Sequence, residues 1–250
     1  MSEQVFSSSG DLGDIIAMCA VIRHMGGGKL LLINRPYTKP MTGERFDYIA
    51  PLLRLQPYLT SVEKHEGDLP EGCIDFSQFR SKWGNGRTLI DKHAAYAGIK
   101  PEEIDINTPW ITVPRGEAHG KIVVVRTARY SGHLAYHNLL QYRAKDCLFL
   151  GLREEFEAFC WNCARNPGKS DPSREAVYRP TRDAIEAAQV ILGARRVVAN
   201  PTFMLWLAIA LGHSAILVDC AQEDSRIERA GIRNVVSCDQ NPLRGEWACL

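Results

Sequence analysis

The amino-acid sequence predicts an α/β protein with two Rossmann-like parallel sheets that face a cleft. Short apolar segments alternate with helical patterns along all 250 residues. Lys121–Arg126 has an unbroken Ile-Val-Val-Val centre, typical of a strand buried on both faces. Between the two runs of elements, Lys100–Gly120 carries Pro101, Pro109 and Pro114 with little periodicity and is the best linker candidate. We therefore expect an N-terminal domain over residues 1–115 and a C-terminal domain over residues 116–250.

The first run begins with a strand at Gln4–Ser8 and an apolar helix at Asp14–Met25. Three glycines, Gly26–Gly28, follow and form a strong helix stop. The other elements expected in this run are strands at Lys29–Asn34, around Val62 and at Cys73–Phe76, helices at Phe46–Leu55 and Leu89–Ala97, and a polar loop at Arg80–Arg87.

The second run restarts the alternation of strand and helix. Gly212 ends its most apolar helix, Phe203–Leu211. The strands expected here are Lys121–Arg126, Cys147–Leu150, Ala176–Tyr178, Arg196–Ala199, Ala215–Val218 and Asn234–Val236, and the helices are Arg153–Cys163, Arg182–Leu192, Phe203–Leu211 and Asp224–Ala230.

Composition excludes several classes of protein. The formal net charge is +1, from 30 basic and 29 acidic residues, so no global charge draws the chain to nucleic acid or anionic lipid. No apolar run reaches the about 20 residues of a membrane span, and the N-terminus lacks a signal-type segment.

The eight cysteines lie mostly in apolar patterns, which indicates reduced thiols and a cytoplasmic protein. Cys160 and Cys163 have CxxC spacing without a second pair, which favours two thiols on a helix face over zinc or redox chemistry.

The most informative motif is the turn Ser7-Ser8-Ser9-Gly10-Asp11-Leu12-Gly13-Asp14, which joins the first strand to the first helix. Glycines allow close backbone approach, and a helix N-terminus carries partial positive charge, so the turn suits an anionic ligand. It lacks the third glycine of a dinucleotide fingerprint and the Gly-Lys-Ser/Thr of a P-loop. A nicotinamide-dependent oxidoreductase is therefore disfavoured.

A second motif spans residues 197–212, where Val197-Val198-Ala199-Asn200-Pro201-Thr202 leads into an apolar helix. Together the two motifs resemble those of the heptosyltransferase-like glycosyltransferases of the GT-B fold. The resemblance implies inverting, metal-independent transfer of a sugar from a nucleotide-diphosphate sugar to an acceptor hydroxyl, with no cofactor besides that donor. The family usually has a histidine just inside the second helix, where this chain has Leu205 or Trp206. Trp206 is read as a core aromatic rather than as a residue that stacks on the sugar.

The resemblance assigns the catalytic base to Asp14, the last acid of the glycine turn. A base must reach the acceptor hydroxyl directly or through one water. Asp11 is the alternative and is placed in the acceptor cleft together with His133. The competing reading of Asp14 is an ordinary first-turn aspartate that stabilises its helix.

Donor binding is assigned to groups that follow strands of the second run. Arg126 and Arg129 follow the first strand of the second run, where the family binds phosphate, and a guanidinium suits phosphate oxygens. A solvated basic loop explains each of these arginines equally well. Gly13 allows the backbone to approach, and Thr202 opens a helix N-terminus, where it also serves as an N-cap. Asn200 either orients its turn or touches the sugar.

Weaker assignments complete the site. Glu154 or Glu155 could accept the ribose hydroxyls, although a favourable first-turn charge explains them equally well. Tyr178 and the residues after it lie where a nucleotide base often packs. His133 and His137 have the i, i+4 spacing of a metal pair, but no third ligand is evident, so no metal is expected.

The leading function is therefore a glycosyltransferase whose partners are a nucleotide-sugar donor and either a saccharide or a hydroxylated base in bacteriophage DNA. A basic rim on the N-terminal domain would bind DNA. It comprises Lys39, Arg45, Arg80, Lys82 and Arg87, with Trp83 between them. Scattered solvated charges are the more common explanation of such residues. The alternative function is a non-catalytic nucleotide or nucleotide-sugar binding protein of the same fold. The sequence names neither the sugar, the nucleobase nor the oligomeric state.

Overall fold

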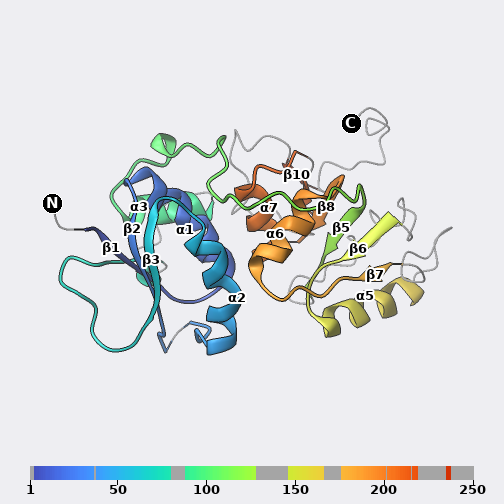
Figure 1. The fold of residues 1–250 in the computed structure, drawn as a ribbon, viewed down its shortest axis with the longest axis horizontal. Coiled ribbons are helices and arrows are strands. Elements are labelled where there is room, and N and C mark those ends of the chain that lie inside the picture. The colour runs from blue at the N-terminus through green and yellow to red at the C-terminus, as the bar shows by residue number, and fades with distance from the viewer. Residues whose placement is uncertain are drawn as a thin grey trace.

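The computed structural model describes residues 3–36, 38–79, 88–127, 146–165, 176–200, 202–214, 216–218 and 235–237. Helices and strands alternate in two successive runs, as the sequence predicts (Figure 1), and the helix expected at Asp224–Ala230 lies outside the described residues. The first run comprises β1 (Val5–Ser8), α1 (Leu12–His24), β2 (Gly28–Ile33), α2 (Gly43–Arg54), β3 (Leu59–His65), β4 (Ile74–Asp75), η1 (Phe76–Gln78), α3 (Leu89–Tyr96) and η2 (Pro101–Glu103). The second comprises β5 (Ile122–Val125), β6 (Cys147–Phe149), α5 (Arg153–Arg165), β7 (Val177–Tyr178), α6 (Ala184–Leu192), β8 (Arg196–Ala199), α7 (Phe203–Ala210), β9 (Ile216–Val218) and β10 (Val235–Ser237).

The strands form two parallel sheets. The first sheet has four strands in the order β3-β2-β1-β4, and the second has six in the order β10-β9-β8-β5-β6-β7. In each sheet the chain runs outward in one direction and then returns to the other side of its first strand. This reversal lies between β1 and β4 in the first sheet and between β5 and β8 in the second. Parallel α/β sheets bind ligands beyond the carboxyl ends of the strands at such reversals.

Helices from both runs pack together between the two sheets. Figure 1 shows α1 and α2 turned toward α7 and α6, and both helix pairs are in contact. One hydrophobic cluster includes fully buried residues of both runs, among them Ile15 of α1 and Leu205 of α7. The carboxyl ends of the two sheets are thereby held in a fixed relation. The domain boundary at residues 115 and 116 stays a prediction.

The glycines after α1 are required by close backbone contacts. A Cβ placed on Gly27 would lie 2.0 Å from the carbonyl oxygen of Tyr58, and one on Gly28 would lie 2.2 Å from that of Gln4. Gly27 also has a φ of +85°, in the region that favours glycine. The predicted helix stop is confirmed, and it lets β2 begin directly against the neighbouring backbone.

The segment Lys100–Gly120, expected as a linker, is anchored to the protein by three buried residues, Ile104, Trp110 and Ile111. Trp110 is 1% exposed, and its indole N–H donates to the carbonyl of Ile16, 2.8 Å away. The Arg23 guanidinium bonds to the backbone carbonyls of Asp105, Thr108 and Pro109. Proline content predicted the irregular backbone correctly. It did not reveal the burial, because that depends on a tryptophan inserted against α1.

Cys19, Cys73, Cys147 and Cys160 form no disulfide bond with another described residue. Burial raises the pKa of the Cys19 thiol to about 12 and that of Cys147 to about 11. These two cysteines are therefore protonated packing residues at neutral pH. Cys160 lies on α5, as expected, whereas the side chain of Cys163 lies outside the described residues. Among the residues that the structure describes, no helix has the length and hydropathy needed to cross a membrane.

Candidate functional site

The two sequence motifs, which lie almost two hundred residues apart, meet in space. A Cβ placed on Gly13 in the first turn of α1 would lie 3.1 Å from Cδ1 of Trp206 and 3.6 Å from the backbone N and Cα of Phe203. Helix α1 begins at the carboxyl end of β1, and α7 begins at the carboxyl end of β8. The carboxyl edges of the two sheets therefore converge here. We call this region the junction: the turn 9–14, the β5 end at 126–127, and residues 200 and 202–206 around the start of α7.

Asp14 is the third residue of α1 and lies at the junction. It is 5% exposed, and its backbone N–H donates to the carbonyl of Asp11 at 3.0 Å. Its Oδ2 lies 3.9 Å from a Cβ placed on Gly10, whose φ is +103°. Glycine at position 10 thus bends the turn so that the Asp14 carboxylate is held close under it.

Asp11 is the N-cap residue of α1, but its side chain makes no capping hydrogen bond to the helix. Its carboxylate instead forms an ion pair with Lys39 at 3.2 Å, and the Asp11 side chain is 31% exposed. Asp11 is therefore more accessible than Asp14, and its charge is partly balanced.

The loop after β2 covers the glycine turn. A Cβ placed on Gly10 would lie 3.5 Å from Cβ of Thr38, and the Arg45 guanidinium donates to the Gly10 carbonyl at 2.9 Å. Lys39 and Arg45, expected on a basic rim, are therefore engaged with the turn itself. The remaining basic residues proposed for that rim, Arg80, Lys82 and Arg87, lie outside the described residues.

At the second sheet, Asn200 holds the loop after β5. Asn200 is completely buried, and its amide nitrogen donates to the carbonyl of Thr127 at 3.0 Å. Its amide oxygen accepts from the Thr127 N–H at 3.2 Å. Arg126, immediately before Thr127, is also buried. Of the two roles open to Asn200, the observed contacts are those of a residue that orients the turn.

Helix α7 begins as expected. The Thr202 hydroxyl accepts from the N–H of Leu205 at 3.4 Å, so Thr202 is the N-cap. Trp206 is 3% exposed, which confirms the core reading of this residue. Because Trp206 packs on Gly13, it sets the spacing between α1 and α7.

The two glutamates at the start of α5 differ in their contacts. Glu155 folds back so that its Oε2 accepts from the backbone N–H of Leu152 at 3.0 Å, which caps the helix. Glu154 is exposed and forms no hydrogen bond or ion pair with another described residue. Nearby, Arg153 lies over the ring of Tyr178 at 5.3 Å. Of the two candidates for the ribose hydroxyls, Glu154 is the accessible one.

Arg129, His133 and His137 lie outside the described residues. Within the described part of the chain, no group of three or more His, Cys, Asp or Glu side chains is arranged to hold a metal ion.

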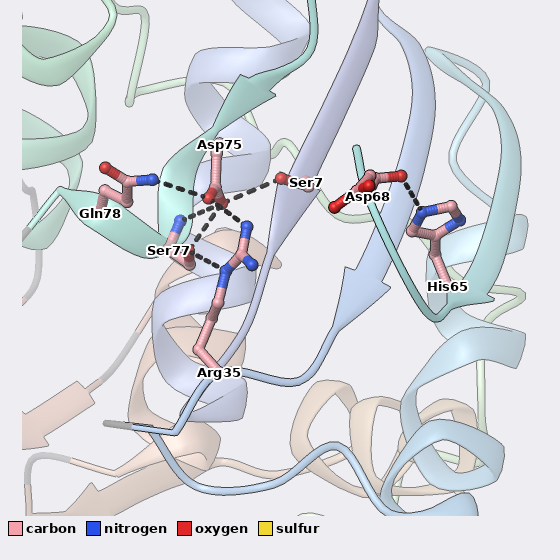
Figure 2. A network of polar contacts seen from close by, with 7 residues as sticks. All are labelled: Ser7, Arg35, His65, Asp68, Asp75, Ser77 and Gln78. Carbon is pink, nitrogen blue, oxygen red and sulfur yellow. Dashed lines mark hydrogen bonds and ion pairs between the residues drawn. The ribbon is translucent and has the colours of Figure 1, made fainter. Parts of the chain in front are cut away.

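Sequence reasoning missed a buried polar cluster at the carboxyl end of the first sheet, shown in Figure 2. Asp75, at the end of β4, is 8% exposed. Its Oδ1 accepts from the hydroxyls of Ser7 at 2.9 Å and Ser77 at 2.6 Å, and its Oδ2 accepts from Arg35 at 2.7 Å. We call Ser7, Arg35, Asp75, Ser77 and Gln78 the Asp75 cluster. Asp75 is the last residue of a two-residue strand, and no local sequence pattern marks it as part of a site.

Burial by itself raises the pKa of the Asp75 carboxyl. Hydrogen bonds from Ser77, Arg35, Ser7 and Gln78 outweigh burial and hold the pKa below its ordinary value. Asp75 is therefore an ionised anchor for the Arg35 guanidinium at neutral pH.

Comparison with solved structures identifies the fold. A family 9 glycosyltransferase from Veillonella parvula DSM 2008 superposes with a TM-score of 0.54 at 8% identity, over 94% of this chain and 85% of that one. The heptosyltransferase TibC, solved in complex with ADP-D-β-D-heptose, superposes with a TM-score of 0.51 at 13% identity, over 92% of this chain. The chain has the fold of these glycosyltransferases. It spans 63% of the length of TibC.

A third solved structure, the E. coli heptosyltransferase WaaC with ADP, superposes with a TM-score of 0.49 at 12% identity, over 86% of each chain. No protein-family model and no curated protein sequence matches the chain. The low identities mean that the site residues have to be argued from this chain alone.

Proposed function

We propose that the protein is an inverting, metal-independent glycosyltransferase of the GT-B type. In this proposal residues 1–115 bind the acceptor, and residues 116–250 bind a nucleotide-diphosphate sugar. The observation that carries it is the convergence of the α1 and α7 N-termini, seen in the contact of Gly13 with Phe203 and Trp206. Two helix N-termini directed at one place favour a multiply charged anion such as a diphosphate.

Asp14 is the proposed catalytic base. Its carboxylate lies beside the same convergence, at the acceptor-side sheet. In an inverting transfer the base takes the proton of the attacking hydroxyl while the bond from the anomeric carbon to the diphosphate breaks. Negative charge then builds up on the leaving diphosphate.

The leaving group is stabilised from the second sheet. Arg126 at the end of β5 supplies positive charge, and the backbone N–H groups of the first turn of α7 supply hydrogen-bond donors. Asn200 fixes the loop that follows Arg126 through its two bonds to Thr127. Glu154 is the proposed partner of the ribose hydroxyls.

The proposed acceptor is a saccharide. Lys39 and Arg45, two of the basic residues considered for DNA, contact Asp11 and Gly10 instead. A hydroxylated DNA base remains the alternative acceptor predicted from the sequence. ADP-heptose is the first donor to test, because TibC was solved with that molecule.

The test begins with calorimetric titration of ADP-heptose and of UDP-, GDP- and CMP-sugars. One donor is expected to bind and to raise the melting temperature by mass action. Hydrolysis or transfer of that donor is then measured for Asp14→Asn, with the exposed Asp47→Asn of α2 as the matched control.

Asp14→Asn is expected to bind the donor normally and to lose turnover by about 10²–10⁴-fold, the usual contribution of a general base. Asp47→Asn is expected to behave as the wild type. Unchanged turnover in Asp14→Asn would remove the base assignment. Donor binding without turnover in the wild type would favour the non-catalytic alternative, and no binding across the panel would refute both.

A further inference from the structure

The Asp75 carboxylate accepts five hydrogen bonds within the Asp75 cluster. Besides Arg35, Asp75 accepts from the backbone N–H and the hydroxyl of Ser77, from the hydroxyl of Ser7, and from the amide of Gln78 at 3.2 Å. Three of these bonds reach Oδ1, and Oδ2 accepts from Gln78 and from Arg35. The serine and glutamine donors fix the Asp75 carboxylate, and the carboxylate in turn fixes the arginine.

Arg35 is held by one side of its guanidinium. Its Nη2 donates to Asp75 Oδ2 at 2.7 Å, and its Nε lies 3.4 Å from the hydroxyl of Ser77. Its Nη1 makes no hydrogen bond or ion pair with any residue that the structure describes. The Arg35 side chain is 27% exposed, whereas that of Asp75 is 8% exposed. One edge of the fork is thus fixed (Figure 2), and the side chain as a whole stays partly exposed.

The register of the strands explains why these side chains meet. Ser7 on β1 is paired with Asp75 on β4 and with Leu31 on β2. Paired residues of a parallel sheet lie on the same face, and alternate residues share that face. Arg35 lies two residues past the end of β2, in the loop that continues this strand. The cluster is therefore built into the carboxyl end of three adjacent strands.

The cluster also neighbours the proposed catalytic base. The carbonyl of Arg35 accepts from the Thr38 hydroxyl at 3.1 Å, and Thr38 packs on Gly10. Gly10 in turn lies over the Asp14 carboxylate. Arg35 thus belongs to the loop that covers the turn carrying Asp14, on the side of the first sheet.

We propose that Arg35 is a specificity-determining residue that binds an oxyanion, a carboxylate or a phosphate monoester, on the acceptor. The inference rests on the proposed function, because it places the acceptor at the first sheet. A guanidinium with a fixed orientation presents its remaining N–H groups in the planar geometry that suits an oxyanion. An acceptor held in this way would carry its acidic group on the Arg35 side and its reactive hydroxyl toward Asp14.

The test uses small probes in place of the acceptor. Methyl phosphate, glucuronate and the uncharged methyl glucoside are titrated into the full chain and followed by ligand-observed NMR. ADP is present at saturation to block anion binding at the donor side. The wild type is expected to bind at least one of the two anions saturably and not to bind methyl glucoside. The anion that binds identifies the acidic group.

Three variants isolate the contribution of Arg35. Arg35→Gln is expected to weaken anion binding by about tenfold or more, the factor for losing a charge-assisted hydrogen bond. Arg35→Lys is expected to keep the charge and to recover part of the affinity. Arg115→Gln, which changes an exposed arginine in the segment between the two sheets, is expected to bind as the wild type does.

Circular dichroism and the affinity for ADP show whether each variant is folded. Absence of saturable binding by the wild type would overturn the inference, as would equal binding by a folded Arg35→Gln. If no nucleotide binds at all, the proposed function fails. The response of the anion titration to Arg35→Gln would still report on this site.

Discussion

Gly13 of α1 and Trp206 of α7 are packed so closely that a Cβ on the glycine would lie 3.1 Å from Cδ1 of the indole. Residues of the two sheets are thereby brought together at the start of both helices. Because glycine has only a hydrogen atom as its side chain, the N-terminus of α1 can lie this close to the N-terminus of α7. The proposed donor-binding geometry therefore depends on the small size of Gly13.

Enlarging Gly13 is expected to separate α1 from α7. Gly13→Ala is expected to be nearly neutral in stability, because the gain in helix propensity of about 1 kcal/mol offsets a small shift of Trp206. Gly13→Val is expected to lower the free energy of unfolding by about 1–3 kcal/mol through overpacking, and to reduce donor affinity. Urea unfolding and calorimetric titration with the donor measure the two effects.

Gly43→Val is the control, because a Cβ on Gly43, at the start of α2, meets nothing within 4 Å. Equal donor affinity in Gly13→Val and in the wild type would show that the approach of the two helices does not matter for binding.

In our interpretation Asn200 only holds the backbone of Thr127 in place. Its replacement should therefore weaken donor binding more than it slows the transfer step. Asn200→Ala deprives both backbone groups of Thr127 of a buried partner. We expect a loss of about 1–3 kcal/mol in stability. In steady-state kinetics the KM for the donor should rise several-fold while kcat changes little. Asn107→Ala, at an exposed position, is the control. A fall in kcat with constant KM would instead indicate direct contact with the reacting sugar.

The sequence was sufficient to predict the alternation of elements and the two turns at the junction. Apolar strand cores such as Ile122–Val125 and glycine stops such as Gly26–Gly28 are local signals, and the structure confirms both. The burial of Trp206 was also predicted, because it lies in a continuously apolar helix. Local patterns of this kind need no knowledge of distant partners.

Two features could not be predicted, because they depend on partners far away in the chain. Trp110 is buried against Ile16, which is 94 residues distant. Ser7 bonds to Asp75 across 68 residues, and only the register of β1 with β4 reveals the pair. Serine, aspartate and arginine are also ordinary loop residues, so nothing local marked the Asp75 cluster as a site.

Mutation of the two glutamates of α5 is expected to have different effects, on stability for Glu155 and on nucleotide binding for Glu154. Glu155→Gln removes a charged acceptor from the N–H of Leu152 and should lower stability by about 0.5–1 kcal/mol. Glu154→Gln should leave stability unchanged and weaken nucleotide binding several-fold by loss of a ribose contact. Thermal unfolding and titration with ADP and with 2′,3′-dideoxy-ADP distinguish the two effects. If Glu154→Gln binds both nucleotides as the wild type does, the ribose contact lies elsewhere.

The Asp75 cluster should make stability depend on pH in the acid range. The folded-state pKa of Asp75 lies below its ordinary value, so the unfolded chain takes up a proton first as the pH falls. Asp75 therefore contributes fully to stability above about pH 5, and the contribution is lost as the pH falls from about 4 through the folded pKa.

Asp75→Asn removes this ionised acceptor and should cost about 2 kcal/mol at pH 7, because Arg35 then lacks its charged partner. The difference from the wild type should shrink steadily below pH 4, as the wild-type carboxyl itself becomes neutral. Urea unfolding of both proteins between pH 3 and pH 7 measures it, with Asp47→Asn, at an exposed position of α2, as the matched control. A difference that stays constant down to pH 3 would mean that the effect of the substitution is one of packing, and that the ionised carboxylate does not hold Arg35 in place.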